Sequence, residues 1–183
     1  MASGLAASEK DVLAPSFACF LLSNSYEQIR MSVALPKLDV KLVGSHSGIS
    51  IGEDGPSQMS IKDISLATSF PNFTVLVLAD APSMKAATKA MFAHEGPVYL
   101  RTGRPKVSVV YEDGIELEIG KANELRAGND LTIITCGLMV VAALEAADNL
   151  NGNGIHARVL DMYTLKPLGG KLSKKPRVKQ ALS

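Results

Sequence analysis

The stretch HSGISIGEDGPSQ, residues 46–58, combines side chains that can handle protons and hydroxyl groups. His46 could act as a general acid or base, or donate a hydrogen bond to a substrate oxygen, because imidazole titrates near neutral pH. Asp54 could contact a substrate, although an aspartate among glycines also caps turns through its own side chain. Gln58 could be a first-turn partner of the next helix. The loop 46–58 is therefore a candidate functional loop, although a lone histidine after a strand and an aspartate in a turn can also have purely structural roles.

Other chemistries find little support in the residue pattern. Glu53 and Asp54, followed by glycine, resemble half of a calcium loop, but the remaining carboxylates of such a loop are missing. No cluster of His, Cys, Asp and Glu has the spacing of a metal site, and the glycine motifs of nucleotide-binding loops do not occur. We predict no metal ligands in this chain and no serine-hydrolase chemistry.

Two aromatic residues, Phe17 and Phe20, stand three positions apart ahead of a helical pattern. They could pack into a core. They could also form a platform on which a flat heteroaromatic ring lies, because aromatic faces stack favourably.

Short apolar runs alternate with helical patterns along the first part of the chain. This alternation is typical of an α/β fold with a mainly parallel sheet flanked by helices. In such folds ligands bind beyond the carboxyl ends of the strands, which is where 46–58 begins. We predict strands over 40–45, 74–79 and 97–101, and helices over 25–35, 59–70 and from Asp80 to about Ala93.

The later part of the chain changes character after residue 110. Asp113-Gly114 between alternating apolar runs indicates a β-hairpin, so we expect 111–127 to be a connecting hairpin. A strand at 131–137, a helix at 138–150 and a strand at 156–162 then form one βαβ unit. A parallel sheet covered on both faces needs more strands, so this unit looks incomplete. We predict domains at 1–110 and 128–168, joined by 111–127, with a basic, disordered tail at 169–183.

Composition limits the classes of partner. The formal net charge is +1, which gives no reason to expect nucleic acid or an anionic membrane; the tail could be a basic binding patch, but a solvated end is the simpler interpretation. Cys19 and Cys136 lie in apolar runs and favour buried thiols in a reducing compartment. No apolar stretch is long enough for a membrane span, and the N-terminus lacks a secretory signal. We expect a cytoplasmic protein.

Six tracts of the chain resemble transketolases and occur in the order found there. The match covers residues 2–167, and its histidine-to-EDGPSQ block is highly specific. Related thiamine enzymes share parts of the scheme but fit the EDGPSQ and YEQIR blocks less well. The tracts are SFACFLLSNSYEQIRMSV, VGSHSGISIGEDGPSQMSIKDI, FPNFTVLVLADAPS, GPVYLRTGRP, IGKANELRAGNDLTIITCG and ARVLDMYTLKPL.

The resemblance implies a fold, a cofactor and a reaction. Transketolases use thiamine diphosphate to transfer a two-carbon ketol unit between sugar phosphates. Their N-terminal domain holds the diphosphate and a divalent metal, Mg²⁺ or Ca²⁺, and their middle domain holds the pyrimidine ring at a dimer interface. This chain looks like the middle, pyrimidine-binding domain of the thiamine-diphosphate-binding fold, followed by the start of the third domain. Its implied partners are sugar phosphates, and either a second copy or an N-terminal transketolase section.

The resemblance also assigns roles to residues. Phe17 and Phe20 match the aromatics that pack on the pyrimidine. His46 matches a histidine of the substrate channel and is the catalytic candidate, while Asp54 matches an aspartate that contacts a substrate hydroxyl. Gln58 lies at a position that is occupied by histidine or glutamine in the family. Arg104 matches the arginine that binds the substrate phosphate.

The chain departs from the family pattern in ways that bear on activity. The glutamate that activates the cofactor would lie just upstream of Met1, and Glu9 comes after that motif. Lys62 replaces an acid, and Thr68 a frequent arginine. Because the diphosphate loop also belongs to the N-terminal domain, we expect no catalysis by this chain alone. Two alternatives stay open: a non-catalytic fragment that dimerises or binds a partner, and a different thiamine enzyme, although Arg104 and His46 favour sugar phosphates.

Overall fold

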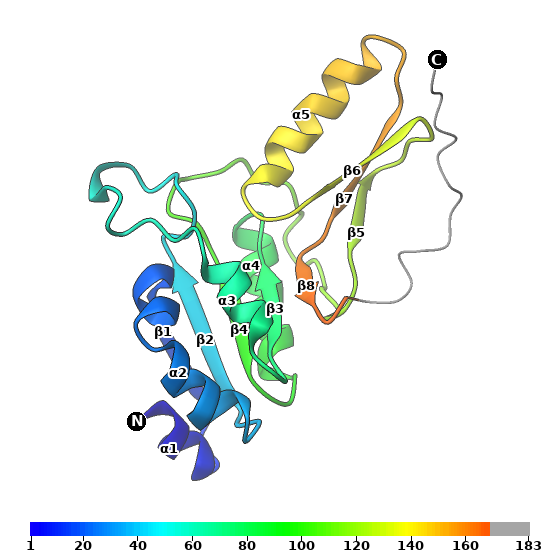
Figure 1. The fold of residues 1–183 in the computed structure, drawn as a ribbon. Helices are drawn as coiled ribbons and strands as arrows, with labels where there is room; N and C mark the ends of the chain where they lie inside the picture. Colours follow the sequence, from blue (N-terminus) through cyan, green and yellow to red (C-terminus); the bar gives the residue numbers. More distant parts are fainter. Residues whose placement is uncertain (169–183) are drawn as a thin grey trace.

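The computed structural model describes residues 1–168, so the predicted tail at 169–183 lies outside the described residues. The first part of the chain builds a five-stranded sheet in the order β1-β2-β4-β3-β8 (Figure 1). β1 to β4 run parallel, and β8 joins β3 in the antiparallel sense. The predicted α/β fold with a mainly parallel sheet is therefore confirmed. The strands are β1 (Val12–Phe17), β2 (Val40–Ser45), β3 (Thr74–Val77), β4 (Val98–Arg101) and β8 (Thr164–Lys166).

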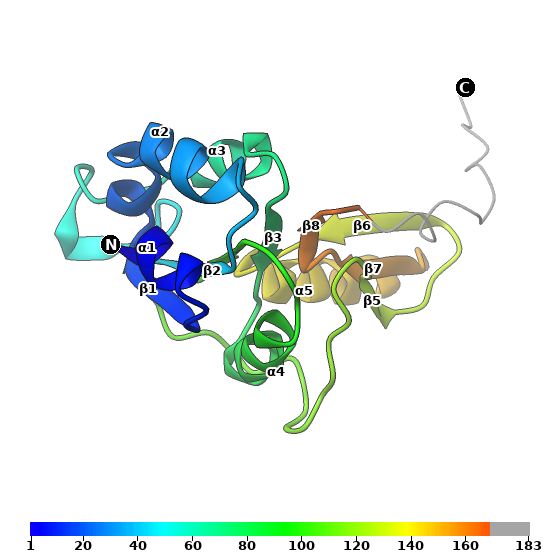
Figure 2. The same cartoon turned by 90° about the horizontal axis from the view of Figure 1, so that it is seen from below.

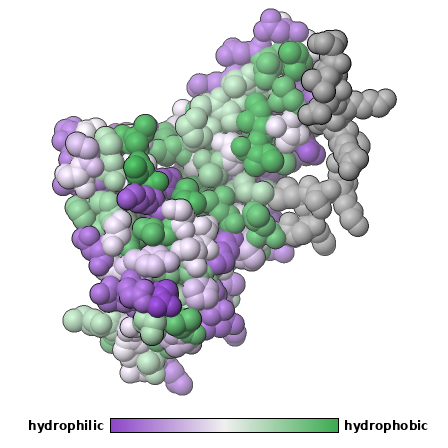
Figure 3. All heavy atoms as spheres, in the orientation of Figure 1, coloured by the Kyte–Doolittle hydropathy of each residue, from purple (hydrophilic) through white to green (hydrophobic). Residues whose placement is uncertain are grey.

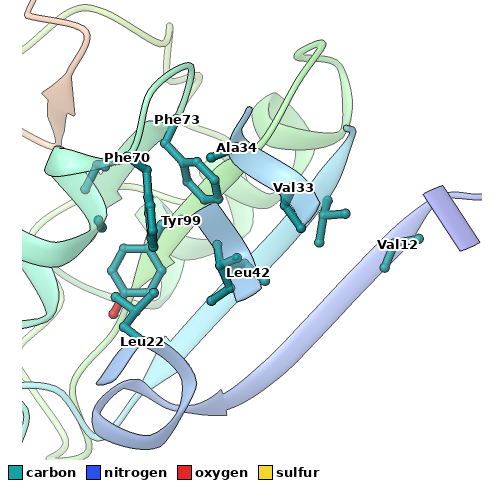
Figure 4. Packing of buried hydrophobic residues seen from close by; sticks show 12 residues of the cluster. Val12, Leu22, Val33, Ala34, Leu42, Phe70, Phe73 and Tyr99 are labelled. Carbon is teal, nitrogen blue, oxygen red and sulfur yellow. The ribbon is translucent and has the colours of Figure 1, made fainter. Parts of the chain in front are cut away.

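Helices cover both faces of this sheet, as Figure 2 shows with α2 and α3 on one side and α4 on the other. Successive side chains along each strand point to opposite faces of the sheet. Val75 and Tyr99 pack toward α2 and α3, whereas Leu76 and Leu100 pack toward α4. Figure 4 shows the first of these clusters, in which Phe70, Phe73 and Tyr99 lie close together. The helices are α1 (Ala2–Ala7), α2 (Tyr26–Ile29), α3 (Asp63–Ser69) and α4 (Ala81–Phe92), with π-helical turns at Cys19–Ser23 and Arg30–Ala34.

The helix limits follow from local chemistry. Asp80 caps α4 by accepting from the Ser83 N–H at 2.9 Å, while the Asp80 N–H donates to Ser83 Oγ, as expected for a helix that begins there. The predicted helix at 59–70 is shorter than expected and begins only at Asp63. Residues 59–62 are irregular instead, and Ser60 forms an isolated bridge with Gly48 across the neck of the 46–58 loop.

The predicted hairpin at 111–127 is wrong. Asp113-Gly114 does form a turn, with Gly114 at φ 90°, but the flanking residues do not pair with each other. Leu117 and its apolar neighbours pack against α4 instead, because burying them there removes more apolar surface from water than an isolated ribbon would. The strand β5 (Asn123–Arg126) pairs with β7 in the second sheet.

The predicted βαβ unit is confirmed as β6 (Leu131–Thr135), α5 (Met139–Asn151) and β7 (Ala157–Asp161). β6 and β7 are parallel, and β5 adds an antiparallel strand, giving the order β5-β7-β6. The helix α5 lies against one face of this sheet (Figure 1). Its Ala143 and Ala147 pack on Ala157 and Val159 of β7. Ile134, on the opposite face, is 63% exposed.

After β7 the chain returns to the first sheet, which the sequence did not lead us to expect. The Val77 N–H donates to Tyr163 O at 2.8 Å, and Lys166 Nζ donates to Thr68 O at 2.8 Å. β8 thus ties the second sheet to the first. Within residues 1–168, no helix has the length and apolar character needed to cross a membrane.

Candidate cofactor and substrate site

The candidate site lies at the carboxyl edge of the first sheet. Phe17 ends β1 and pairs in register with Ser45, which ends β2 and precedes His46. Arg101 ends the neighbouring strand β4, and Arg104 follows three residues later. Parallel pairing therefore brings together segments that are far apart in the sequence.

An aromatic stack forms at this edge. The Phe17 and His46 rings lie 3.8 Å apart between centroids with an interplanar angle of 13°, and Phe20 stacks on Phe17 at 5.9 Å. His46 adopts a left-handed φ of 55°, and its Nδ1 lies 3.0 Å from Ser45 Oγ. The backbone turn at the end of β2 thus aims the imidazole at Phe17 rather than along the strand.

The stack borders open space. Phe20 is 41% exposed and lines a cleft of about 270 Å³ together with Ser57, Ser60 and Lys62. Phe17 is half-buried and Phe20 is exposed, so neither belongs to the sheet–helix core.

Two backbone hydrogen bonds close the neck of the loop. The Gly48 N–H donates to Ser60 O at 2.9 Å, and the Ser60 N–H donates to Gly48 O at 3.2 Å. A third bond runs from the Ser47 N–H to Thr102 O at 3.2 Å. The loop is therefore held to the segment after β4 as well as to the residues that precede α3.

A buried polar cluster that the sequence analysis missed lies under this neck. Asp63 accepts from Arg101 Nε at 2.6 Å and from the Tyr99 hydroxyl at 3.0 Å. Burial, reinforced by the Asp63 charge, raises the pKa of Tyr99. An acid at the first position of an apolar helix was the available signal, but its partners on β4 could not be inferred from sequence.

Arg104 and Asp54 are also brought together. Arg104 Nη1 lies 3.1 Å from Asp54 Oδ2 and bonds to Ile51 O, while Nη2 donates to Glu53 Oε1 at 2.8 Å. The hydrogen bond with Glu53 raises the pKa of Arg104 and lowers that of Glu53. The arginine assigned to a substrate phosphate is thus engaged by acids of the loop.

The predicted residues therefore form two groups, the aromatic stack and the Arg104 group. Among residues 1–168, no hydrogen bond or ion pair connects Arg104 with His46. Gln58 belongs to neither group, because its side-chain Oε1 accepts from the adjacent Ser57 hydroxyl. Glu9 precedes β1, at the opposite end of that strand from Phe17.

Two other chemistries can be compared with this geometry. The tract 48–52, GISIG, matches the Gly-x-Ser-x-Gly pattern of serine hydrolases, but Ser50 lies within the loop and not at a strand-to-helix turn. Among residues 1–168, no group of three His, Cys, Asp or Glu side chains is arranged to hold a metal ion.

The fold is that of an α/β domain with a candidate ligand site at the carboxyl edge of its sheet, followed by a small second α/β unit. Residues 1–109 match the transketolase pyrimidine-binding domain, and residues 120–180 match the transketolase C-terminal domain. The chain belongs to the transketolase family.

Individual relatives agree with this placement. The chain is 41% identical to a Methanocaldococcus jannaschii protein that carries the name transketolase C-terminal section, over 97% of this chain and 57% of that protein. It is 40% identical to a 6-deoxy-6-sulfo-D-fructose transketolase subunit of Clostridium sp., over 91% and 52%. The chain thus spans about half the length of the curated relatives it matches.

Solved structures show the same fold. A split-gene transketolase, described as an inactive beta4 tetramer, superimposes with a TM-score of 0.85 at 41% identity, covering 92% of this chain and 54% of that one. A mutant transketolase from Pichia stipitis gives 0.75 at 26% identity, covering 85% and 23%.

Proposed function

We propose that this chain supplies the pyrimidine-binding and sugar-phosphate-binding part of a thiamine-diphosphate-dependent transketolase that transfers a two-carbon ketol unit between sugar phosphates. The observation that carries the proposal is the stack of Phe20, Phe17 and His46 beside an open cleft at the carboxyl edge of the sheet.

The residues present fit one end of the cofactor. Phe20 lies nearly parallel to Phe17 and is accessible, so a flat pyrimidine can stack on Phe20 at the end of the aromatic stack. When bound, thiamine diphosphate supplies stabilisation of negative charge on the transferred carbon unit. The chain's part is to orient the ring and exclude water from it. In this proposal the diphosphate and its Mg²⁺ or Ca²⁺ are held by an N-terminal section.

The polar groups fit an anionic sugar. His46 can donate to or accept from a hydroxyl, and it is the candidate for proton transfer at a substrate oxygen. Asp54 and Gln58 are proposed to contact hydroxyls, and Arg104 a phosphate, for which a planar guanidinium is suited. Relatives are named for a sugar sulfonate and for apulose 4-phosphate, both anionic, which supports an anion-binding residue here.

A partner is part of the proposal. Relatives are named as a C-terminal section and as subunits, and a structural neighbour is described as a split-gene transketolase. Ile49 and Ile61 stand on the site's rim and are more than 70% exposed, at 72% and 73%. Figure 3 shows further hydrophobic residues on the face that includes α5. Exposed apolar side chains near the site favour a covering partner, so we expect no turnover by the chain alone.

The test measures transfer from xylulose 5-phosphate to ribose 5-phosphate, with thiamine diphosphate and magnesium. The chain is assayed alone and together with a transketolase N-terminal section, and cofactor binding is followed by calorimetry. Turnover only in the mixture supports the proposal. Assembly with the section, but no turnover and no cofactor binding, would instead favour the non-catalytic interaction module.

A further inference from the structure

Arg104 is not free in the described structure, because the loop that it faces occupies its donor fork. Nη2 donates to Glu53 Oε1 at 2.8 Å, and Nη1 bonds to Ile51 O and lies 3.1 Å from Asp54 Oδ2. Both terminal nitrogens are thus engaged. A phosphate that binds the same fork with two parallel hydrogen bonds needs at least one of these nitrogens.

The loop backbone is shaped to deliver the acids to the guanidinium. The 3-10 turn Gly52–Asp54 begins at Gly52, with φ 77°, and is followed by Gly55, with φ 74°. A Cβ at Gly52 would lie 3.5 Å from Arg104 Nη1, so the turn passes close to the arginine. Ile51, only 1% exposed, anchors the turn in the protein interior. The turn therefore presents consecutive carboxylates to one arginine.

The two acids differ in how firmly they are held. The Glu53 side chain is 85% exposed, whereas that of Asp54 is 31% exposed. An exposed carboxylate keeps most of its hydration when it leaves its partner, so its ion pair is the easier to exchange. Ile51 O and Asp54 can keep their places beside Nη1 while Nη2 exchanges partners.

We infer that Glu53 is a built-in counter-ion of Arg104 that a substrate phosphate must displace, so that this glutamate sets how strongly the site prefers phosphorylated sugars. The inference deepens the proposed function and rests on the proposed role of Arg104. A sugar without phosphate leaves Arg104 paired with Glu53, so no unpaired cation results. A phosphorylated sugar replaces the Glu53 carboxylate by its own phosphate. Its binding free energy therefore contains only the difference between the phosphate–Arg104 and Glu53–Arg104 interactions. Removing the carboxylate therefore strengthens phosphate binding more than it strengthens binding of a neutral sugar.

The first measurement follows the Glu53 carboxyl carbon by NMR in the full chain during a pH titration. Arg104 holds the pKa of Glu53 below its usual range, so Arg104→Ala should raise it. Inorganic phosphate should raise it too, relative to sodium chloride at equal ionic strength. If phosphate leaves the pKa of Glu53 unchanged, phosphate does not displace Glu53 from Arg104 and the inference is contradicted.

The second measurement compares ribose 5-phosphate with ribose in calorimetric titrations of the chain assembled with an N-terminal section. Glu53→Gln should tighten ribose 5-phosphate by about two- to five-fold and leave ribose unchanged. The matched control is Glu112→Gln, an exposed glutamate outside the loop, which should change neither.

Arg104→Ala tests the phosphate role of Arg104 separately from the counter-ion role of Glu53. If it weakens ribose 5-phosphate while Glu53→Gln has no effect, the phosphate role of Arg104 stands and the counter-ion role of Glu53 is wrong. If Arg104→Ala leaves ribose 5-phosphate binding unchanged, Arg104 is not the phosphate ligand and the inference about Glu53 is overturned with it.

Discussion

Arg101 and Asp63 form an ion pair beneath the neck of the 46–58 loop, with Arg101 Nε donating to Asp63 Oδ2 at 2.6 Å. The side chains are 16% and 2% exposed, so water does little to weaken the pair. The Tyr99 hydroxyl donates to the same oxygen at 3.0 Å. The pair connects the end of β4 to the start of α3, the two elements between which the loop is held.

We expect Asp63→Ala to destabilise the protein by about 3–5 kcal/mol, because it leaves a largely buried guanidinium without its partner. Urea unfolding followed by circular dichroism measures the loss. Asp113→Ala, at an exposed turn, is the control and should change stability by less than about 0.5 kcal/mol. Equal effects of the two substitutions would show that the pair does not hold the fold.

We expect Phe20→Ala to weaken thiamine diphosphate binding while changing stability little. Phe20 is 41% exposed, so its removal opens no core cavity. Phe92 on α4, which is 45% exposed, provides a control of the same residue type. Calorimetric titration of each variant, assembled with an N-terminal section, distinguishes a binding platform from a general loss of apolar surface. A platform predicts at least about five-fold weaker binding for Phe20→Ala only, since a lost aromatic stack is worth roughly 1 kcal/mol.

Asp161 should make stability depend on pH in an unusual direction. Burial raises its pKa to about 6, although the Tyr111 hydroxyl donates to Oδ2 at 2.7 Å, and its Oδ1 has no hydrogen-bond partner in the described structure. The folded chain therefore holds this proton more tightly than the unfolded chain does. The contribution to stability is complete below about pH 4, the ordinary aspartate value. It is lost as the pH rises through about 6, by roughly 3 kcal/mol.

The variant Asp161→Asn cannot titrate and isolates this group from other carboxylates. Its free energy of unfolding relative to the parent protein should rise by about 3 kcal/mol between pH 4 and pH 7.5, whatever its absolute value. Urea unfolding at several pH values measures the difference. A difference that stays flat over this range would mean that Asp161 titrates at its ordinary pKa.

Gly128→Ala should destabilise the second sheet by about 1–3 kcal/mol. A Cβ there would lie 2.3 Å from the Ala157 carbonyl carbon and 2.4 Å from His156 O, so the backbone that enters β7 must shift. Gly4→Ala in α1 meets nothing within 4 Å and should be neutral or slightly stabilising, because alanine favours helix. Thermal unfolding of both variants gives the comparison; similar melting temperatures would contradict the close approach.

The sequence was informative where local chemistry decides structure. The Asp80 cap, the strand at 40–45 and the βαβ unit around α5 could all be predicted from caps and apolar runs. Prediction failed where a segment had a choice of partners. The 111–127 stretch carries a hairpin signal, yet Leu117 packs against the α4 cluster and β5 pairs with β7. Such a choice depends on which surfaces are available once the sheet has formed.

The candidate site also has features that could be predicted from the sequence and features that only the structure shows. The residue types in 46–58 indicated a polar functional loop, Phe17 and Phe20 indicated a possible aromatic platform, and the resemblance to transketolases added the phosphate role of Arg104. Only the tertiary structure decided that His46 stacks on Phe17, that Glu53 and Asp54 occupy Arg104, and that Asp63 anchors the loop through Arg101. Spacing along a chain limits only near neighbours, whereas these contacts join residues brought together by parallel strand pairing. Their strength depends on burial and direction, which arise only when the sheet and its helices pack.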